Sequence, residues 1–285
     1  MSDEKINEVT VLNVAAIQMC SSKSIEDNIK QACDLIEAAA NAGAQFIVTP
    51  EMTSFVVNNK ADLLARACKE TEDPALKAFQ SLAKRLKVYV QIGSIAILGE
   101  QEKCFNRSFL INSLGEISAR YDKIHLFDVD LPNGEVFKES ASYHAGETAV
   151  IADLPQAKVG LSICYDVRFP SLYSTLAKSG AEIIVIPAAF THTTGLAHWH
   201  VLCRARAIET ACFIIAAAQV GLHEDGRTTY GHSLIISPWG DILAEADGVN
   251  QGFISADINL ADVATTRQRI ANLQHQKPFQ LAGDE

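Results

Sequence analysis

The sequence predicts an α/β fold in which two sheets pack face to face and helices cover their outer faces. Short apolar segments alternate with helical segments along the 285 residues. Strands that are apolar throughout are buried on both faces, so they need helices or another sheet against them. One pattern also occurs twice, at residues 39–51 and 175–189: a helix end, Gly-Ala, an apolar strand and a proline. The alternative is that this pattern is only the succession of helix end, turn and strand that any αβ chain contains.

The first half of the chain begins with a strand, and a helix follows it. The helix opens after Ser24 and stops at Gly43, which are typical start and stop signals. In chain order, the expected elements are strand 9–19, helix 24–43, strand 44–51, helical segments within 60–86, and strands 88–98 and 107–117 with a turn at 112–115.

Regular periodicity is lost over residues 121–146. A loop of this length inside a compact domain is more often functional than a packing element. The pattern then resumes with strand 159–164, helix 170–180, strand 181–190, a helix near 197–211, strand 212–221, paired strands over 232–246, and a helix from about 261 followed by a polar tail. No Pro/Gly/Ser-rich linker separates the halves, so we expect a single domain over residues 1–285.

Composition excludes several classes of function. The net charge is −10 and no basic run is present, so neither nucleic acid nor an anionic membrane surface is an expected partner. The chain opens with the acidic "MSDEKINE", and no apolar run approaches ~18 residues, which predicts a soluble, cytoplasmic protein. Seven cysteines are scattered without CxxC spacing, which predicts reduced thiols rather than a disulfide framework or a zinc ribbon.

Three residues stand where strands or loops could present reactive groups. Cys164 ends an apolar strand shortly before Pro170, which suits the first turn of a helix. A helix N-terminus would lower the pKa of this thiol, although a small buried hydrophobe is the alternative. Glu51 also ends an apolar strand, where a carboxylate is costly unless it is solvated or has a function. The alternative is that Glu51 only caps a helix or lies in a turn. Lys123 opens the long loop, and its alternative is an ordinary solvated lysine.

Two other signals are not expected to form sites. His192, His198 and His200 are spaced so that they face different ways on a helix, and no nearby run of carboxylates completes a metal site. No metal is therefore expected. The arginines of residues 203–210 are expected to make internal ion pairs rather than to bind anions from solution.

Seven motifs together resemble the nitrilase superfamily of carbon–nitrogen hydrolases over almost the whole chain. They are "AAIQM", "VTPEM", "YDKIHLFDVD", "FKES", "GLSICYDVRFP", "AHWHVLCRARAIET" and "YGHSLIISPWG". The resemblance implies a four-layer α-β-β-α sandwich that assembles through its helical faces into a homodimer or a higher homo-oligomer. It also implies a catalytic triad of Glu51, Lys123 and Cys164, with a second glutamate at Glu139.

The resemblance further implies amide hydrolysis through a thioester on the cysteine. Glu51 would take the thiol proton and later activate water, while Lys123 and a backbone N–H after Cys164 would stabilise the oxyanion. Glu139 would orient Lys123 and the substrate amide. No metal or organic cofactor is implied.

Within the superfamily, these motifs are most similar to those of the branch that cleaves deaminated glutathione into α-ketoglutarate and cysteinylglycine. The alternatives are an omega-amidase acting on α-ketoglutaramate, another small amide or nitrile hydrolase, and a non-catalytic partner-binding protein of the same fold. The four expected substrate-binding residues follow two strand ends: Tyr165, Arg168, Phe190 and Thr194. Packing of the two aromatic rings, and an ion pair between Arg168 and Asp166, are the alternatives.

Three departures from the usual motifs are expected beside the substrate pocket. Ser171 and His200 stand where the family usually has glutamate, and Leu196 stands where it usually has proline. These substitutions leave the three triad positions unchanged.

Overall fold

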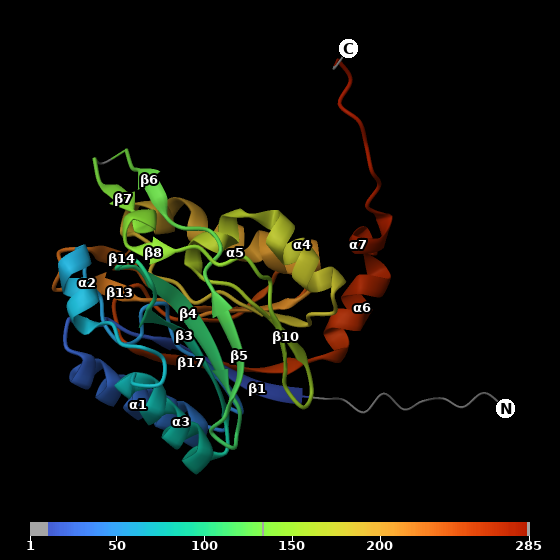
Figure 1. Ribbon diagram of the computed structural model, residues 1–285. Coiled ribbons are helices and arrows are strands. Elements are labelled where there is room, and N and C mark those ends of the chain that lie inside the picture. Colours follow the sequence, from blue (N-terminus) through green and yellow to red (C-terminus); the bar gives the residue numbers. More distant parts are fainter. Residues whose placement is uncertain (1–10, 133, 284–285) are drawn as a thin grey trace.

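The protein has four layers, with two sheets at the centre and helices outside each of them (Figure 1). The computed structural model describes residues 11–132 and 134–283, so residues 9–10 of the first expected strand and the last two residues of the tail lie outside it. Helices α1 and α3 cover one sheet, and α4 and α5 cover the other. The predicted α-β-β-α sandwich is confirmed.

The helices occupy most of the predicted segments. They are α1 (Ile25–Asn41), α2 (Lys60–Arg66), α3 (Pro74–Leu86), α4 (Pro170–Lys178), α5 (His192–Thr210), α6 (Ala261–Arg269) and α7 (Asn272–His275), with two 3₁₀ turns, η1 (Glu139–Ala141) and η2 (Cys164–Arg168).

The strands form two large sheets and two small ribbons. The first sheet runs β17 (Gly252–Asn259), β1 (Val11–Gln18), β2 (Phe46–Val48), β3 (Tyr89–Leu98), β4 (Cys104–Ile111) and β5 (Ile117–Asp122), with β8 (Tyr143–His144) beside β4. The second runs β9 (Ile151–Asp153), β10 (Lys158–Leu161), β11 (Ile183–Val185), β12 (Phe213–Ala216), β15 (Leu234–Ile236) and β16 (Ile242–Glu245). The ribbons pair β6 (Asp128–Asp130) with β7 (Val136–Lys138), and β13 (Val220–Leu222) with β14 (Thr228–Tyr230).

The two sheets share one pairing pattern. From β17 in the first sheet and from β9 in the second, successive pairs are antiparallel, parallel, parallel, antiparallel and antiparallel. The sequence repeat supplies the third strand of each, β2 and β11. Gly43 and Gly180, before those strands, have φ values of 106° and 100°, which favour glycine. The repeated segment therefore marks a structural repeat, and not only the succession of helix end, turn and strand found in any αβ chain.

Strand β1 shows how the layers are held together. Val14 and Ala16 belong to the core shared with the second sheet, whereas Ala15 and Ile17 belong to the core under α1 and α3. All four side chains are fully buried. Since side chains alternate between the faces of a strand, a strand buried on both faces must be apolar at every position.

Helix α5 begins at His192, five residues before the expected start near 197. Thr191 caps it by accepting a hydrogen bond from the N–H of Thr194. Gly195 lies in the first turn because a Cβ there would be 2.3 Å from the Cβ of Tyr230. A Thr-Thr-Gly run has low helix propensity, so tertiary packing against β14 decides this helix start.

The site lies where several strands end. Glu51 follows β2, Lys123 follows β5, and Cys164 begins η2 after β10. A Cβ on Gly93 would lie 2.2 Å from the carbonyl oxygens of Thr49 and Pro50, so only glycine lets β3 approach the segment that carries Glu51.

The long loop of residues 121–146 is more ordered than its lack of periodicity suggested. It contains the β6–β7 ribbon, η1 and β8.

All seven cysteines of the chain are free thiols. Within residues 11–132 and 134–283, no helix is both long enough and apolar enough to cross a bilayer.

Candidate active site

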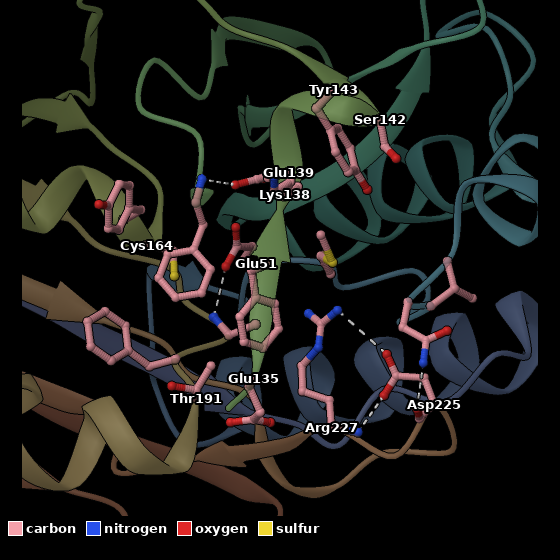
Figure 2. A pocket seen from close by; sticks show the side chains of 18 of the residues that line it. Glu51, Glu135, Lys138, Glu139, Ser142, Tyr143, Cys164, Thr191, Asp225 and Arg227 are labelled. Carbon is pink, nitrogen blue, oxygen red and sulfur yellow. Dashed lines mark hydrogen bonds and ion pairs between the residues drawn. The ribbon is translucent and has the colours of Figure 1, made fainter. Parts of the chain in front are cut away.

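Four of the expected residues border one cavity of about 490 Å³ (Figure 2). They are Glu51, Lys123, Glu139 and Cys164, and they come from four segments that are distant in the sequence. The structure therefore brings together the complete set that the motifs had singled out.

Lys123 is held between two carboxylates. Its Nζ lies 2.8 Å from Oε1 of Glu51, and 3.1 and 2.9 Å from the two oxygens of Glu139. The side chains of Lys123 and Glu51 are only 2% and 4% exposed. Buried charges are tolerated when they are paired and hydrogen-bonded, and this cluster satisfies both conditions.

Three further hydrogen-bond donors, which the sequence did not single out, complete the cluster. Nδ2 of Asn106 donates to Glu51 at 2.9 Å and to Glu139 at 3.1 Å. The backbone N–H of Ala189 donates to Glu51 at 2.9 Å, and that of Phe127 to Glu139 at 2.7 Å. For Asn106, the only signal in the sequence was an amide side chain within the largely apolar segment "CFNRSFLI". The structure shows that this side chain is buried. Backbone donors leave no trace in a sequence.

Cys164 has a strained backbone. Its φ is 47°, in the left-handed region that non-glycine residues rarely adopt. Its N–H donates to the carbonyl of Pro187 at 2.8 Å. Strain of this kind persists only where the surroundings enforce it, and it is common at functional sites.

The buried carboxylate of Asp166 fixes the turn that carries Cys164. It accepts hydrogen bonds from the N–H of Ile163 at 2.8 Å and from the hydroxyl of Tyr121 at 2.7 Å. It also accepts the N–H of His125 at 3.0 Å. These contacts tie η2, on the second sheet, to β5 and the long loop, on the first.

Burial raises the pKa of the Cys164 thiol well above its ordinary value, and the charge of Glu51 raises it further, against the opposing effect of Lys123. The expectation of a lowered pKa is therefore wrong. The helix that was expected to lower it, α4, begins only at Pro170. Helix-terminus effects fall off within one turn, whereas burial and the charge of Glu51 act on the thiol directly.

Glu51 and Lys123 are both held in their charged forms. Burial alone would raise the pKa of Glu51, but the charge and hydrogen bond of Lys123 outweigh it and hold this pKa below its usual value. Burial alone would lower the pKa of Lys123, but the charges of Glu139 and Glu51 raise it well above its usual value. The resting site thus contains a thiol, a carboxylate base and a permanent ammonium.

Three of the four expected substrate-binding residues line the cavity: Tyr165, Phe190 and Thr194. Arg168 does not. Its guanidinium lies 5.8 Å from the ring centroid of Tyr165 and 5.2 Å from that of Phe190, and it contacts Nδ1 of His198 at 3.3 Å. It therefore packs behind the lining rings. The alternative pair with Asp166 is also absent among the described side chains, because Asp166 binds Tyr121 and the segment at His125 instead.

The three departures from the family motifs, expected beside the pocket, do not line the cavity itself. Ser171 is exposed on α4, Leu196 is 69% exposed on α5, and His200 contacts Glu245.

Of the two arginines of α5, Arg206 makes the expected internal ion pair, whereas Arg204 has a backbone carbonyl as its partner. Arg204 donates to the carbonyl of Gly240, and Arg206 donates to that of Val167 and pairs with Glu209.

Comparison with known proteins agrees with this geometry. The family model for carbon-nitrogen hydrolase matches residues 13–268. The chain belongs to this family. It is therefore a carbon–nitrogen hydrolase, as its motifs predicted.

Relatives of the chain share one printed name. Deaminated glutathione amidase of Synechocystis is 42% identical over 265 residues, covering 92% of this chain and 96% of that protein. The Yersinia enterocolitica protein of that name is 40% identical over 272 residues, covering 93% of each chain. The human protein of that name is 36% identical over 270 residues, covering 93% of this chain and 82% of that protein.

Two solved structures share the fold. The NitFhit protein of C. elegans superposes with a TM-score of 0.87 at 34% identity, covering 94% of this chain and 66% of that longer one. Nit3 of Saccharomyces cerevisiae, a member of branch 10 of the nitrilase superfamily, gives 0.82 at 27% identity and covers 91% and 94% of the two chains.

Replacing Lys123 by methionine should destabilise the protein by about 3–5 kcal/mol at neutral pH, because two buried carboxylates lose their counter-charge. The lowered pKa of Glu51 contributes stability above its unfolded value of about 4.3, and this contribution is lost as the pH falls through the folded pKa. In Lys123→Met, burial raises that pKa instead. The difference between the two proteins in urea unfolding should therefore shrink as the pH falls.

Lys30 offers the control, since it pairs with Asp34 on the surface with 78% of its side chain exposed. Lys30→Met should leave the free energy of unfolding nearly unchanged. Equal effects of the two substitutions, or a difference that does not depend on pH, would contradict the account of the cluster.

Proposed function

We propose that this hydrolase cleaves the amide of deaminated glutathione through a thioester on Cys164. One observation carries the proposal: a strained, buried thiol lies at the same cavity as a buried carboxylate that is paired with a charged lysine. A nucleophile, a base and an oxyanion stabiliser are the groups that acyl transfer requires. A scaffold that only bound a partner would have no use for the three together.

In the first half of the reaction, Glu51 takes the Cys164 proton while the sulfur attacks the amide carbon. The carbonyl oxygen becomes an oxyanion, which Lys123 and the N–H of Tyr165, in the first turn of η2, stabilise. The carbon–nitrogen bond then breaks, and the proton on Glu51 passes to the leaving amine. In the second half, Glu51 takes a proton from water and the hydroxide attacks the thioester carbon. The carbon–sulfur bond then breaks, the acid leaves, and Glu51 returns its proton to the sulfur of Cys164.

The pKa directions fit this order of events. With the pKa of Cys164 raised and that of Glu51 lowered, the proton stays on sulfur until a substrate carbonyl receives the new charge. Transfer of the proton together with attack protects the thiol from side reactions in the empty enzyme. Glu139 positions Lys123 and keeps it charged, so that the ammonium faces the developing oxyanion.

One cation in the cavity wall supports a substrate that carries a carboxylate. Arg227, between β13 and β14, lines the cavity, and its nearest paired carboxylate, Asp225, is 3.6 Å away (Figure 2). Its Nε is buried and has no hydrogen-bond partner in the described part of the chain. A guanidinium binds carboxylates through paired N–H donors. We assign Arg227 to a carboxylate of the substrate, and Tyr165, Phe190 and Thr194 to its remaining surface.

We further propose that the described residues form one domain and that the protein works in the cytoplasm as a homodimer or a higher homo-oligomer. The two sheets share one core, which supports a single domain. Helix α5 exposes three large apolar side chains, Leu196, Val201 and Ile208, at 69%, 68% and 50%, and the last two lie on one side of the helix. Exposed apolar patches are typical of surfaces that associate.

The native protein should hydrolyse deaminated glutathione with a higher kcat/KM than α-ketoglutaramate, and Cys164→Ala should lower kcat by at least about 1,000-fold. Cys68→Ala, which removes a partly buried thiol outside the cavity, is the matched control and should retain activity. Brief exposure to substrate should add the acyl group to the intact mass of the native chain alone. No product from either substrate, or full activity of Cys164→Ala, would contradict the mechanism.

Arg227→Met should raise KM for deaminated glutathione by roughly 10–100-fold with little change in kcat, because a charged hydrogen bond is worth about 1.5–3 kcal/mol. The control is a small neutral amide without a carboxylate, whose KM should stay within about twofold. Arg227→Lys should recover part of the loss. An equal rise in KM for both substrates would show that Arg227 only supports the shape of the cavity.

A further inference from the structure

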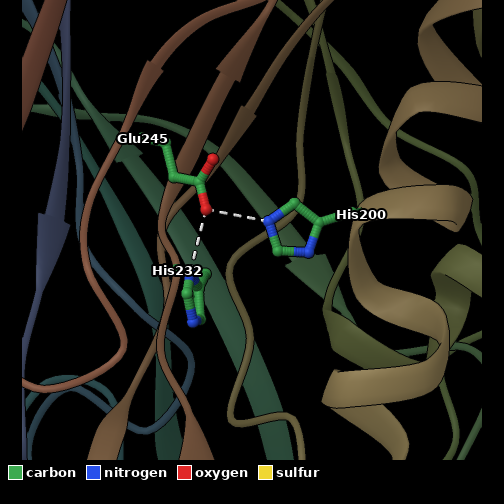
Figure 3. A group of neighbouring side chains, drawn as sticks. All are labelled: His200, His232 and Glu245. Atoms are coloured by element: carbon green, nitrogen blue, oxygen red, sulfur yellow. Dashed lines mark hydrogen bonds and ion pairs between the residues drawn. The ribbon is translucent and has the colours of Figure 1, made fainter.

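Three side chains that are distant in the sequence meet outside the active-site cavity (Figure 3). His200 lies on α5, His232 follows β14, and Glu245 ends β16. Oε1 of Glu245 is 2.9 Å from Nε2 of His200 and 2.9 Å from Nδ1 of His232. One ligand atom of each residue lies within 4.8 Å of those of the other two.

The sequence did not predict this cluster. His200 was set aside as a metal ligand because no carboxylate lay near it in the chain. Glu245 is 45 residues further on, and the fold brings it to hydrogen-bond distance. The expectation that no carboxylate completes a site with these histidines is therefore wrong for His200.

The residue types are those of metal sites with an open position. Zinc and its neighbours among the divalent transition metals favour imidazole nitrogen and carboxylate oxygen, and three protein ligands leave the fourth position for water. Bonds of about 2.0–2.2 Å can span the observed separations after small side-chain movements. In the metal-bound form each imidazole would be neutral, with its one proton on the ring nitrogen that does not bind the metal. A proton that now lies between an imidazole and Glu245 would move to that nitrogen or leave to solvent.

Surrounding contacts hold His232 in place. Its backbone has a φ of 54°, and its carbonyl accepts the indole N–H of Trp199 at 2.7 Å. Its ring stacks on Tyr230 with 4.4 Å between centroids. A Cβ on Gly248 would lie 2.5 Å from Nε2 of His232, so any other residue at position 248 would displace the imidazole ring. A ligand that is fixed before the ion arrives loses less entropy on binding.

Charge and access also suit a cation. The three side chains are 25–36% exposed, so an ion from solvent can reach them. The cluster offers a cation two imidazole nitrogens and one carboxylate oxygen. The whole chain is also acidic, at −10.

We propose that His200, His232 and Glu245 form a binding site for one divalent transition-metal cation of the zinc type. The ion would link α5 to β16 and to the segment after β14, and so stabilise the packing of α5 on the second sheet. Because a ligand that binds only the folded state raises stability, metal should raise the melting temperature. The proposal involves no residue assigned to amide hydrolysis.

Titration calorimetry of the full-length, untagged and metal-stripped protein with Zn²⁺ and with Co²⁺ tests the site. One cation should bind per chain, and Glu245→Gln, which keeps the side-chain shape, should weaken binding by roughly tenfold or more. His200→Asn should do the same. His198→Asn, on the same helix, is the matched control and should bind as the native protein does. Zn²⁺ should raise the melting temperature of the native and control proteins only.

Cys164→Ala separates this site from the active-site thiol, which could also bind zinc. The Co²⁺ complex of the native protein should show visible absorption bands without a thiolate charge-transfer band, and Cys164→Ala should keep both binding and spectrum. Loss of binding in Cys164→Ala, equal binding by native protein and Glu245→Gln, or no binding at all would each overturn the proposal.

Discussion

The ammonium of Lys123 is the charge on which the rest of the site depends. It lies between Glu51 and Glu139, and all three are removed from solvent almost completely. Two carboxylates in so dry a place would otherwise take up protons, and neither could then serve as a base. For the lysine to reach both carboxylates, the ends of β2 and β5 and the start of η1 must lie together. The electrostatics of the site and the meeting of these three elements are therefore one constraint.

The structural repeat explains how Glu51 and Cys164, the proposed base and nucleophile, come to lie at one cavity. Its two copies end after β2 and β11, and those ends touch. Glu51, which closes the first copy, accepts the N–H of Ala189, which closes the second. Pro187, in the second copy, accepts the N–H of Cys164 and so holds its strained backbone. One sheet thus supplies Glu51 and Lys123, the other supplies Cys164, and packing of the sheets assembles the site.

Much of this could be predicted from the sequence, because strand ends and motifs are local features. Glu51, Lys123, Glu139 and Cys164 were all singled out, and so were both halves of the fold. What failed depended on tertiary neighbours. The pKa of Cys164 is decided by burial and by Glu51 rather than by the helix that follows it, and Arg168 packs behind the cavity rings. Asn106 could be found only by knowing what its strand faces.

The central claim is that the resting nucleophile is a neutral thiol beside a charged carboxylate. The measurement that tests it most directly is the thiolate absorbance of the native protein minus that of Cys164→Ala, followed from mildly acidic to alkaline pH. The account expects no Cys164 thiolate at neutral pH and a midpoint above the ordinary cysteine value of about 8.5. A midpoint below that value, with thiolate already present at neutral pH, would contradict it.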